Sequence, residues 1–211
     1  MTNPLPPPAD EVCPTGPGGT AEDRAEPRIA LFIRAAKLAT PAGEYLCVIR
    51  DVSSGGVALR LFHDVPQCAQ SILELQNGDR YPVALVWKLE DRAGFRFVHQ
   101  ADVARIIASP SRHPKRPLRL RLDVEAELVA GLRRFEVRVL DISQAGAKIT
   151  CHTPLALDQK VRIATASLRP LKGRVRWRSG AEAGLSFDEP LGFEELALVV
   201  RDLQAAAGRP T

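Results

Sequence analysis

The chain has 211 residues, a length typical of one or two domains. A hydrophobic content of 45% together with 26% charged residues excludes a chain that is disordered throughout. Apolar runs stay well below the roughly 18 residues that a membrane helix needs, so we expect no membrane span. The first residues lack the basic and apolar regions of a signal peptide. We therefore expect a cytoplasmic protein with reduced thiols at its four cysteines, Cys13, Cys47, Cys68 and Cys151.

The net charge of +4 is unevenly distributed. Residues 1–108 carry 11 Lys and Arg against 13 Asp and Glu, a net charge of −2. Residues 109–211 carry 18 against 12, a net charge of +6. An anionic partner is therefore expected to prefer the second half of the chain.

Residues 1–20 contain six of the 17 prolines and predict a disordered tail. Order is expected from residue 21, and the first half then alternates strand-like runs with turns. The predicted strands are 46–50, 57–61, 81–87 and 94–98, followed by a short helical segment at 101–108.

A polar break at 109–111 predicts a boundary between a first domain, 21–108, and a second domain, 109–211. The second half contains strand-like runs at 118–122, 135–140, 147–150, 173–177 and 184–187. Apolar periodicity, early Glu residues and a following Gly predict a C-terminal helix over 193–207.

The two halves repeat each other with a shift of 90 residues. Asp51, Ser53, Gly56, Trp87, Gly94 and Phe97 fall on Asp141, Ser143, Gly146, Trp177, Gly184 and Phe187. The repeat predicts two copies of one β domain of about 90 residues, most simply a small closed barrel that removes its own edges. We expect the Trp and Phe residues of the repeat to be core.

Each half also places an Arg-x-x-x-Arg pair ahead of an Asp-x-Ser-x-x-Gly turn. The pairs are Arg24 with Arg28 and Arg112 with Arg116, and the turns begin at Asp51 and Asp141. The distance from the second Arg to the Asp is 23 residues in one copy and 25 in the other, which predicts hairpins that differ by about two residues. Two guanidinium groups four residues apart on an extended arm can face one ligand. They suit phosphates or the edge of guanine, while the Asp accepts hydrogen bonds from a base, the Ser donates or accepts, and the Gly admits a flat ligand.

These two motifs resemble those of the PilZ family, bacterial receptor domains for the second messenger cyclic di-GMP, in which the turn begins with Asp or Asn. The resemblance implies an all-β fold with minor α content: two tandem six-stranded antiparallel barrels and a C-terminal helix. It also implies that cyclic di-GMP binds, commonly as an intercalated dimer. The Arg pair would clamp phosphates and guanine, and the Asp and Ser would read the other base. The arm would move on binding, and a protein partner would sense the movement.

The second copy is expected to be the main site, with Arg112, Arg116, Asp141, Ser143 and Gly146 as ligand-binding residues. Its arm is densely basic, because Lys115, Arg119 and Arg121 accompany the Arg pair. The first copy offers Arg24, Arg28, Asp51, Ser53 and Gly56 as a weaker site. Its Arg pair lies among Glu22, Asp23 and Glu26, which neutralise it and repel an anionic ligand.

Other interpretations stay open. Each motif alone is usually structural: an Arg pair forms a solvated face, and an Asp-x-Ser turn satisfies its own backbone. Both barrels could then be ligand-independent protein-interaction modules. A single-stranded nucleic-acid barrel is disfavoured by the lack of a stacking platform. Nucleotide-loop, hydrolase and metalloprotease motifs are missing, and His63, His99, His113 and His152 have no metal-like spacing. The sequence therefore predicts a non-enzymatic receptor without a cofactor, whose protein effector it does not identify.

Overall fold

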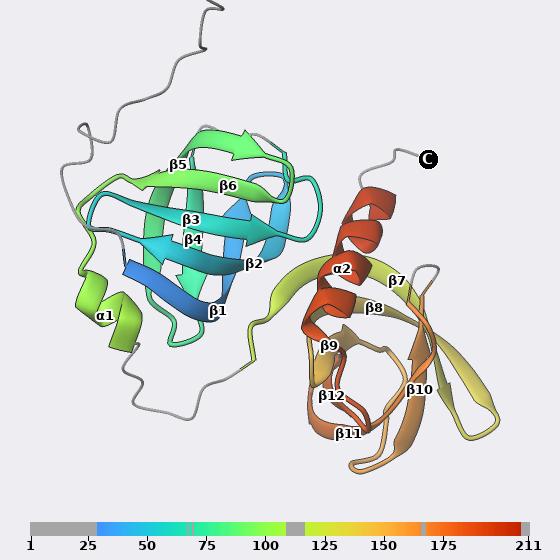
Figure 1. Cartoon of the computed structure of the whole chain (residues 1–211). Helices are drawn as coiled ribbons and strands as arrows, with labels where there is room; N and C mark the ends of the chain where they lie inside the picture. Colours follow the sequence, from blue (N-terminus) through green and yellow to red (C-terminus); the bar gives the residue numbers. More distant parts are fainter. Residues whose placement is uncertain (1–28, 67, 69, 109–116, 166–167, 208–211) are drawn as a thin grey trace, which may run out of the picture.

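The computed structural model describes residues 29–66, 68, 70–108, 117–165 and 168–207. They form two closed antiparallel barrels of six strands each, arranged one after the other along the chain (Figure 1). The predicted fold class is therefore confirmed, and so is the tandem arrangement. The predicted tail at 1–20 lies outside the described residues.

The first barrel contains the first six strands and a short helix. The strand order around the barrel is β1-β2-β3-β6-β5-β4, and β4 pairs with β1 to close it. The elements are β1 (Ile29–Thr40), β2 (Gly43–Val52), β3 (Gly56–Leu61), β4 (Ser71–Leu75), β5 (Arg80–Leu89), β6 (Arg92–Phe97) and α1 (Val103–Ala108).

The second barrel repeats this order as β7-β8-β9-β12-β11-β10, with β10 pairing with β7. Its elements are β7 (Leu120–Ala130), β8 (Arg133–Ser143), β9 (Gly146–Thr150), β10 (Lys160–Ala164), β11 (Leu171–Ser179), β12 (Glu182–Phe187) and α2 (Phe193–Ala207). The identical strand order confirms the internal repeat.

The alternation of apolar and polar residues explains the strands. In β7 the buried positions are every second residue, from Leu120 through Ala126 to Ala130, because successive side chains point to opposite faces. The predicted helix at 193–207 is present as α2. The segments β1, β4 and β10 were not among the predicted strands, although β10 alternates clearly, with Val161 and Ile163 buried.

The predicted difference between the hairpins is wrong. Thr40 pairs with Gly43 at the first hairpin and Ala130 pairs with Arg133 at the second, so both loops have two residues. The copies differ instead at bulges near the start of the first strand of each barrel. The bulge lies between Ala30 and Arg34 in β1, and between 121 and 124 in β7.

Helix α1 is held against barrel 1 by two arginines. Arg34 donates hydrogen bonds of 2.7 and 2.6 Å to the carbonyls of Ile106 and Ile107, which satisfies the end of the helix. Arg105 donates to both carboxylate oxygens of Asp79 at 2.8 and 2.7 Å. This pairing lowers the pKa of Asp79, with Arg105 as the main cause.

The pairing of Asp79 predicts a pH-dependent contribution to stability. Because the folded pKa lies below the unfolded one, the contribution is present above about pH 4 and is lost as the pH falls through the lowered folded pKa. We expect Asp79→Asn to lower the Tm by about 2–4 °C at pH 7 and by much less at pH 3. Thermal unfolding at both values measures this. The control is Asp91→Asn, which breaks an exposed pair with Arg60 and should have little effect at either pH. Equal losses for Asp79→Asn at pH 7 and pH 3 would contradict the interpretation.

The two barrels touch through α2 and the β1–β2 side of barrel 1. Leu46 of β2 is 1% exposed and belongs to the hydrophobic core cluster of barrel 2. Phe62 meets Phe193 of α2 edge-on at 5.5 Å between ring centroids. The Gln204 amide donates to the Glu44 carbonyl at 2.8 Å. In Figure 1, α2 accordingly lies beside both barrels.

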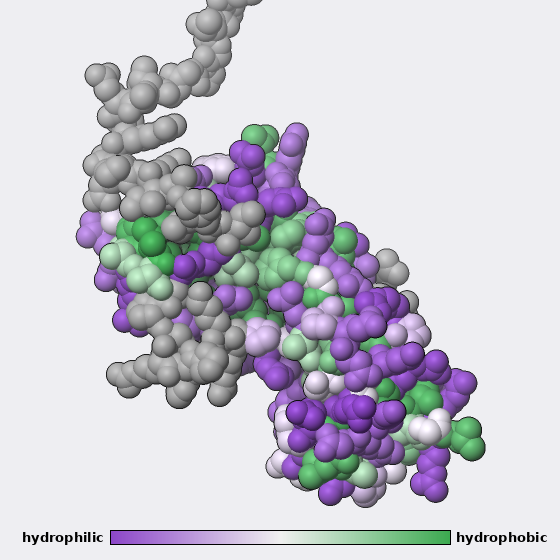
Figure 2. All heavy atoms as spheres, turned by 60° about the horizontal axis from the view of Figure 1, so that its bottom comes forward, coloured by the Kyte–Doolittle hydropathy of each residue, from purple (hydrophilic) through white to green (hydrophobic). Residues whose placement is uncertain are grey.

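The molecular surface in Figure 2 is mostly hydrophilic on the face shown, with apolar areas between the polar ones. Neither helix of the described residues has the length and apolar character needed to cross a bilayer. Cys47, Cys68 and Cys151 are free thiols, and burial raises the pKa of Cys47 far above its ordinary value. Cys13 lies outside the described residues.

Candidate nucleotide sites on the two barrels

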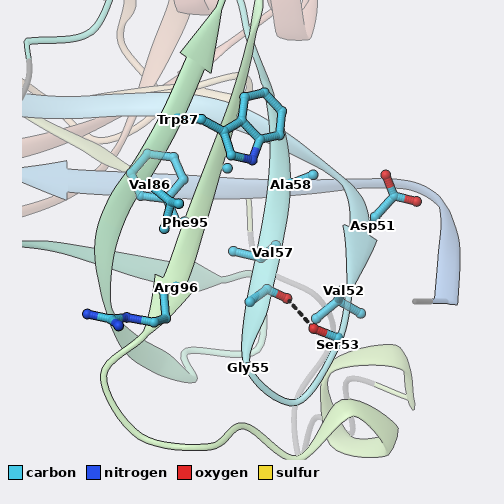
Figure 3. A pocket seen from close by; sticks show the side chains of 12 residues that line it. Asp51, Val52, Ser53, Gly55, Val57, Ala58, Val86, Trp87, Phe95 and Arg96 are labelled. Atoms are coloured by element: carbon cyan, nitrogen blue, oxygen red, sulfur yellow. Dashed lines mark hydrogen bonds between the residues drawn. The ribbon is translucent and has the colours of Figure 1, made fainter. Parts of the chain in front are cut away.

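The Asp-x-Ser-x-x-Gly motif forms the hairpin turn that joins β2 to β3 and β8 to β9. The hydroxyl of Ser53 donates to the Gly56 carbonyl at 3.5 Å, and that of Ser143 donates to the Gly146 carbonyl at 3.2 Å (Figure 3). Ser143 is only 3% exposed. The serine therefore stabilises its own turn, and its part in binding a ligand stays a prediction.

Each turn is also tied to the last residue of a neighbouring strand, β6 or β12. The amides of Phe97 and Phe187 donate to the carbonyls of Gly55 and Ala145 at 3.0 and 2.9 Å. These two bonds are related by the 90-residue shift. The two turns are therefore held by the same main-chain contact.

The motif glycine allows two strands to approach closely. A Cβ atom on Gly146 would lie 2.1 Å from the Leu185 carbonyl oxygen, and one on Gly56 would lie 2.8 Å from that of Phe95. These contacts give the glycine a role in packing against the neighbouring strand, β12 or β6. Its expected role of admitting a flat ligand stays a prediction.

The two motif aspartates differ in their surroundings. In barrel 2, the Arg119 guanidinium donates to Asp141 Oδ1 at 2.6 Å, and the Asp141 side chain is 19% exposed. Lys148 on β9 is the register partner of Asp141. In barrel 1 the register partner of Asp51 on β3 is Ala58. Asp141 thus has a guanidinium partner, while the nearby Lys148 ammonium pairs with Glu182 at 2.7 Å.

In barrel 1 the turn borders a pocket of about 250 Å³. Strands β2, β3, β5 and β6 build this pocket, and Figure 3 shows the side chains that line it. The strands contribute Asp51 from β2, Val57 and Ala58 from β3, Val86 and Trp87 from β5, and Phe95 and Arg96 from β6, and Ser53 adds a wall from the turn. The pocket thus combines one carboxylate and one guanidinium with a largely apolar lining.

The prediction that both tryptophans are core is wrong. Trp87 is 40% exposed and Trp177 is 38% exposed, whereas Phe97 and Phe187 are buried as predicted. Each indole lies across a glycine of the adjacent strand: a Cβ on Gly94 would be 2.0 Å from the Trp87 Nε1 atom, and Gly184 meets Trp177 in the same way. A bulge in β5 and in β11 next to each Trp turns it outward.

The arginine pairs cannot be placed beside these turns. Arg24, Arg28, Arg112 and Arg116 all lie outside the described residues, and so does His113. The turn residues of both motifs are described. The ligand-binding assignment of either set stays a prediction. Among the described residues, no group of three His, Cys, Asp or Glu side chains could hold a metal ion.

The structure is an all-β protein of two tandem six-stranded barrels, each with an Asp-x-Ser-x-x-Gly turn. The sequence matches the family model of the PilZ domain over residues 22–108 and 110–205. The chain therefore belongs to the PilZ family and contains two PilZ domains, one for each barrel. No curated protein matches the sequence.

Several solved structures are similar to this chain at low sequence identity. The PlzA protein of Borreliella burgdorferi, in complex with c-di-GMP, is 14% identical, with 87% of this chain and 95% of that chain covered and a TM-score of 0.35. MrkH of K. pneumonia in its apo state is 12% identical, with coverages of 82% and 88% and a TM-score of 0.32. YcgR of Escherichia coli, in complex with c-di-GMP, is 14% identical, with coverages of 82% and 82% and a TM-score of 0.29.

Proposed function

We propose that this chain is a non-enzymatic bacterial receptor that binds cyclic di-GMP in the cytoplasm, mainly at its second barrel. The observation that carries the proposal is a PilZ match over both barrels together with an accessible Asp141 carboxylate on a preformed turn. Arg119 adds a guanidinium beside that carboxylate, and the second half of the chain carries a net charge of +6, which suits a ligand with two phosphates.

The residues of the main site would divide the ligand between them. Arg112 and Arg116 would take phosphate or guanine with their planar forks, and Asp141 would accept from guanine N–H groups. The Ser143 hydroxyl already donates its proton within the turn, so toward a ligand it could act only as an acceptor. Gly146 would contribute by keeping β9 close to β12.

The first barrel would provide a weaker second site. Asp51, Ser53 and Gly56 form the same turn, and Arg24 and Arg28 precede it in sequence. The turn borders the pocket that contains Trp87, whose exposed indole offers a flat surface for a base. The acidic residues around Arg24 and Arg28 would lower the affinity.

Binding would be relayed to a protein effector by movement of the arm that joins the two barrels. The start of β7 contacts both barrels, so a shift of this segment would change how they sit together. The effector itself is unspecified by the described residues.

A ligand-independent interaction module is the second candidate, and it applies best to barrel 1. Val86 and Leu89 of β5 are 64% and 67% exposed next to the pocket. In barrel 2, the corresponding positions in the repeat hold Arg176 and Ser179. An apolar rim of this kind suits a protein partner better than it suits a nucleotide.

Calorimetric titration of the full chain with cyclic di-GMP tests the proposal. Binding by the wild type is expected, with loss of most affinity in Arg116→Ala because a bound phosphate loses its fork. Arg28→Ala is the matched variant in barrel 1 and should leave the main site intact. Lack of heat at tens of micromolar ligand with folded protein would overturn the proposal and favour the interaction module.

A further inference from the structure

The main chain at the start of β7 is held by barrel 1. We call residues 117–121 the β7 start segment. The Lys37 ammonium donates to the Arg119 carbonyl at 3.0 Å, and the Arg121 amide donates to Glu44 Oε2 at 2.8 Å. Both anchors come from the β1–β2 hairpin of the other barrel.

The two anchors, Lys37 and Glu44, form one ionic cluster with Glu74, which we call the Lys37 clamp. Lys37 is 5% exposed, and its ammonium lies 3.1 Å from Glu44 and 3.4 Å from Glu74. A buried charge is tolerated only when it is paired and hydrogen-bonded. Since the Arg119 carbonyl and the Arg121 amide complete the hydrogen bonding, moving the β7 start segment would take one acceptor from Lys37 and one donor from Glu44.

The side chain of Arg119 points from the same segment to the proposed ligand site. Its guanidinium holds Asp141 Oδ1 at 2.6 Å. One oxygen of the carboxylate is thus held by Arg119, and this contact sets the orientation of the whole Asp141 side chain.

The repeat provides an internal comparison for the Lys37 clamp. The 90-residue shift places Lys37 on Glu127 and Glu44 on Arg134, an ion pair with the charges exchanged. This second pair is 3.0 Å long, with side chains 71% and 47% exposed for Arg134 and Glu127. The buried clamp is consequently a feature of the junction between the barrels, rather than a requirement of the hairpin.

We infer that barrel 1 supplies positioning residues for the ligand site of barrel 2, an inference that rests on the proposed function. Lys37 and Glu44 fix the main chain at Arg119 and Arg121. Arg119 is thereby held where it orients the Asp141 carboxylate toward the ligand. The second site is complete only with the first barrel in place.

Cyclic di-GMP affinity of full-length variants tests this inference. We expect Glu44→Ala, Lys37→Met and Arg119→Gln each to bind cyclic di-GMP about tenfold more weakly than the wild type. Glu44→Gln keeps an acceptor for the Arg121 amide and should recover most of the loss. Arg134→Gln, which breaks the exposed pair at the equivalent position, should bind like the wild type. If Lys37→Met does not fold, Glu44→Ala decides alone.

A double-variant cycle separates positioning from general destabilisation. If Glu44 acts through Arg119, the double variant Glu44→Ala/Arg119→Gln should bind no more weakly than Arg119→Gln alone. Additive losses would overturn the inference, and so would wild-type affinity in Glu44→Ala.

Amide hydrogen exchange of the ligand-free protein tests whether Glu44→Ala releases the β7 start segment. The Arg121 amide should exchange faster in Glu44→Ala than in the wild type, while the exchange rates of the other strand amides in both barrels should be unchanged. Unchanged exchange at Arg121 would overturn the inference without any ligand. Failure of the wild type to bind cyclic di-GMP would instead overturn the proposed function, and the inference with it.

Discussion

Asp141→Ala is expected to weaken cyclic di-GMP binding at the second barrel by about 10- to 100-fold. Hydrogen bonds to a charged group contribute about 1.5–3 kcal/mol each, and this substitution removes the carboxylate that would accept them from the ligand. It also releases Arg119, which loses its 2.6 Å contact with Oδ1. Calorimetry with full-length protein measures the change.

Two matched variants define what this result means. Asp141→Asn preserves the shape and an acceptor oxygen, and should bind more tightly than Asp141→Ala. Asp51→Ala makes the same change in barrel 1 and should leave the main site unaffected. Equal affinities for the wild type and Asp141→Ala would show that the second turn does not bind the ligand.

Gly146→Ala is expected to destabilise the protein strongly. The new Cβ would lie 2.1 Å from the Leu185 carbonyl oxygen and 3.2 Å from its carbon, both main-chain atoms that cannot rotate away. Separating β9 from β12 to relieve this contact should cost about 3 kcal/mol and lower the Tm by about 10 °C. Thermal unfolding followed by circular dichroism measures it.

The repeat supplies graded controls for the glycine. Gly56→Ala meets the Phe95 carbonyl at 2.8 Å and should cost less than Gly146→Ala. Gly55→Ala, in the same turn of barrel 1, meets nothing within 4 Å and should change the stability by under about 0.5 kcal/mol. A wild-type Tm for Gly146→Ala would contradict the packing role.

Local sequence patterns predicted much of the fold. The Asp-x-Ser-x-x-Gly turn, the matched Trp residues and the 90-residue shift were sufficient to predict two copies of one barrel. Strand β10 could also have been predicted, because Val161 and Ile163 alternate with charged residues. Strand β1 carries no such clean alternation and was missed for that reason.

Other features depend on contacts that a sequence does not display. A bulge beside Trp87 reverses the face on which the side chain lies, and the period-two pattern gives no sign of it. The pairing of Arg119 with Asp141 and the grip of Lys37 on the β7 start segment join residues 22 and 82 positions apart. The first contact depends on how barrel 2 closes, and the second depends on how the two barrels dock.

Leu46 couples the unfolding of the two barrels. It is a side chain of the first barrel that belongs to the apolar interior of the second. Separating the two barrels would leave a cavity in the core of barrel 2 and an exposed apolar side chain, Leu46, on barrel 1. The molecule should consequently melt in a single cooperative step.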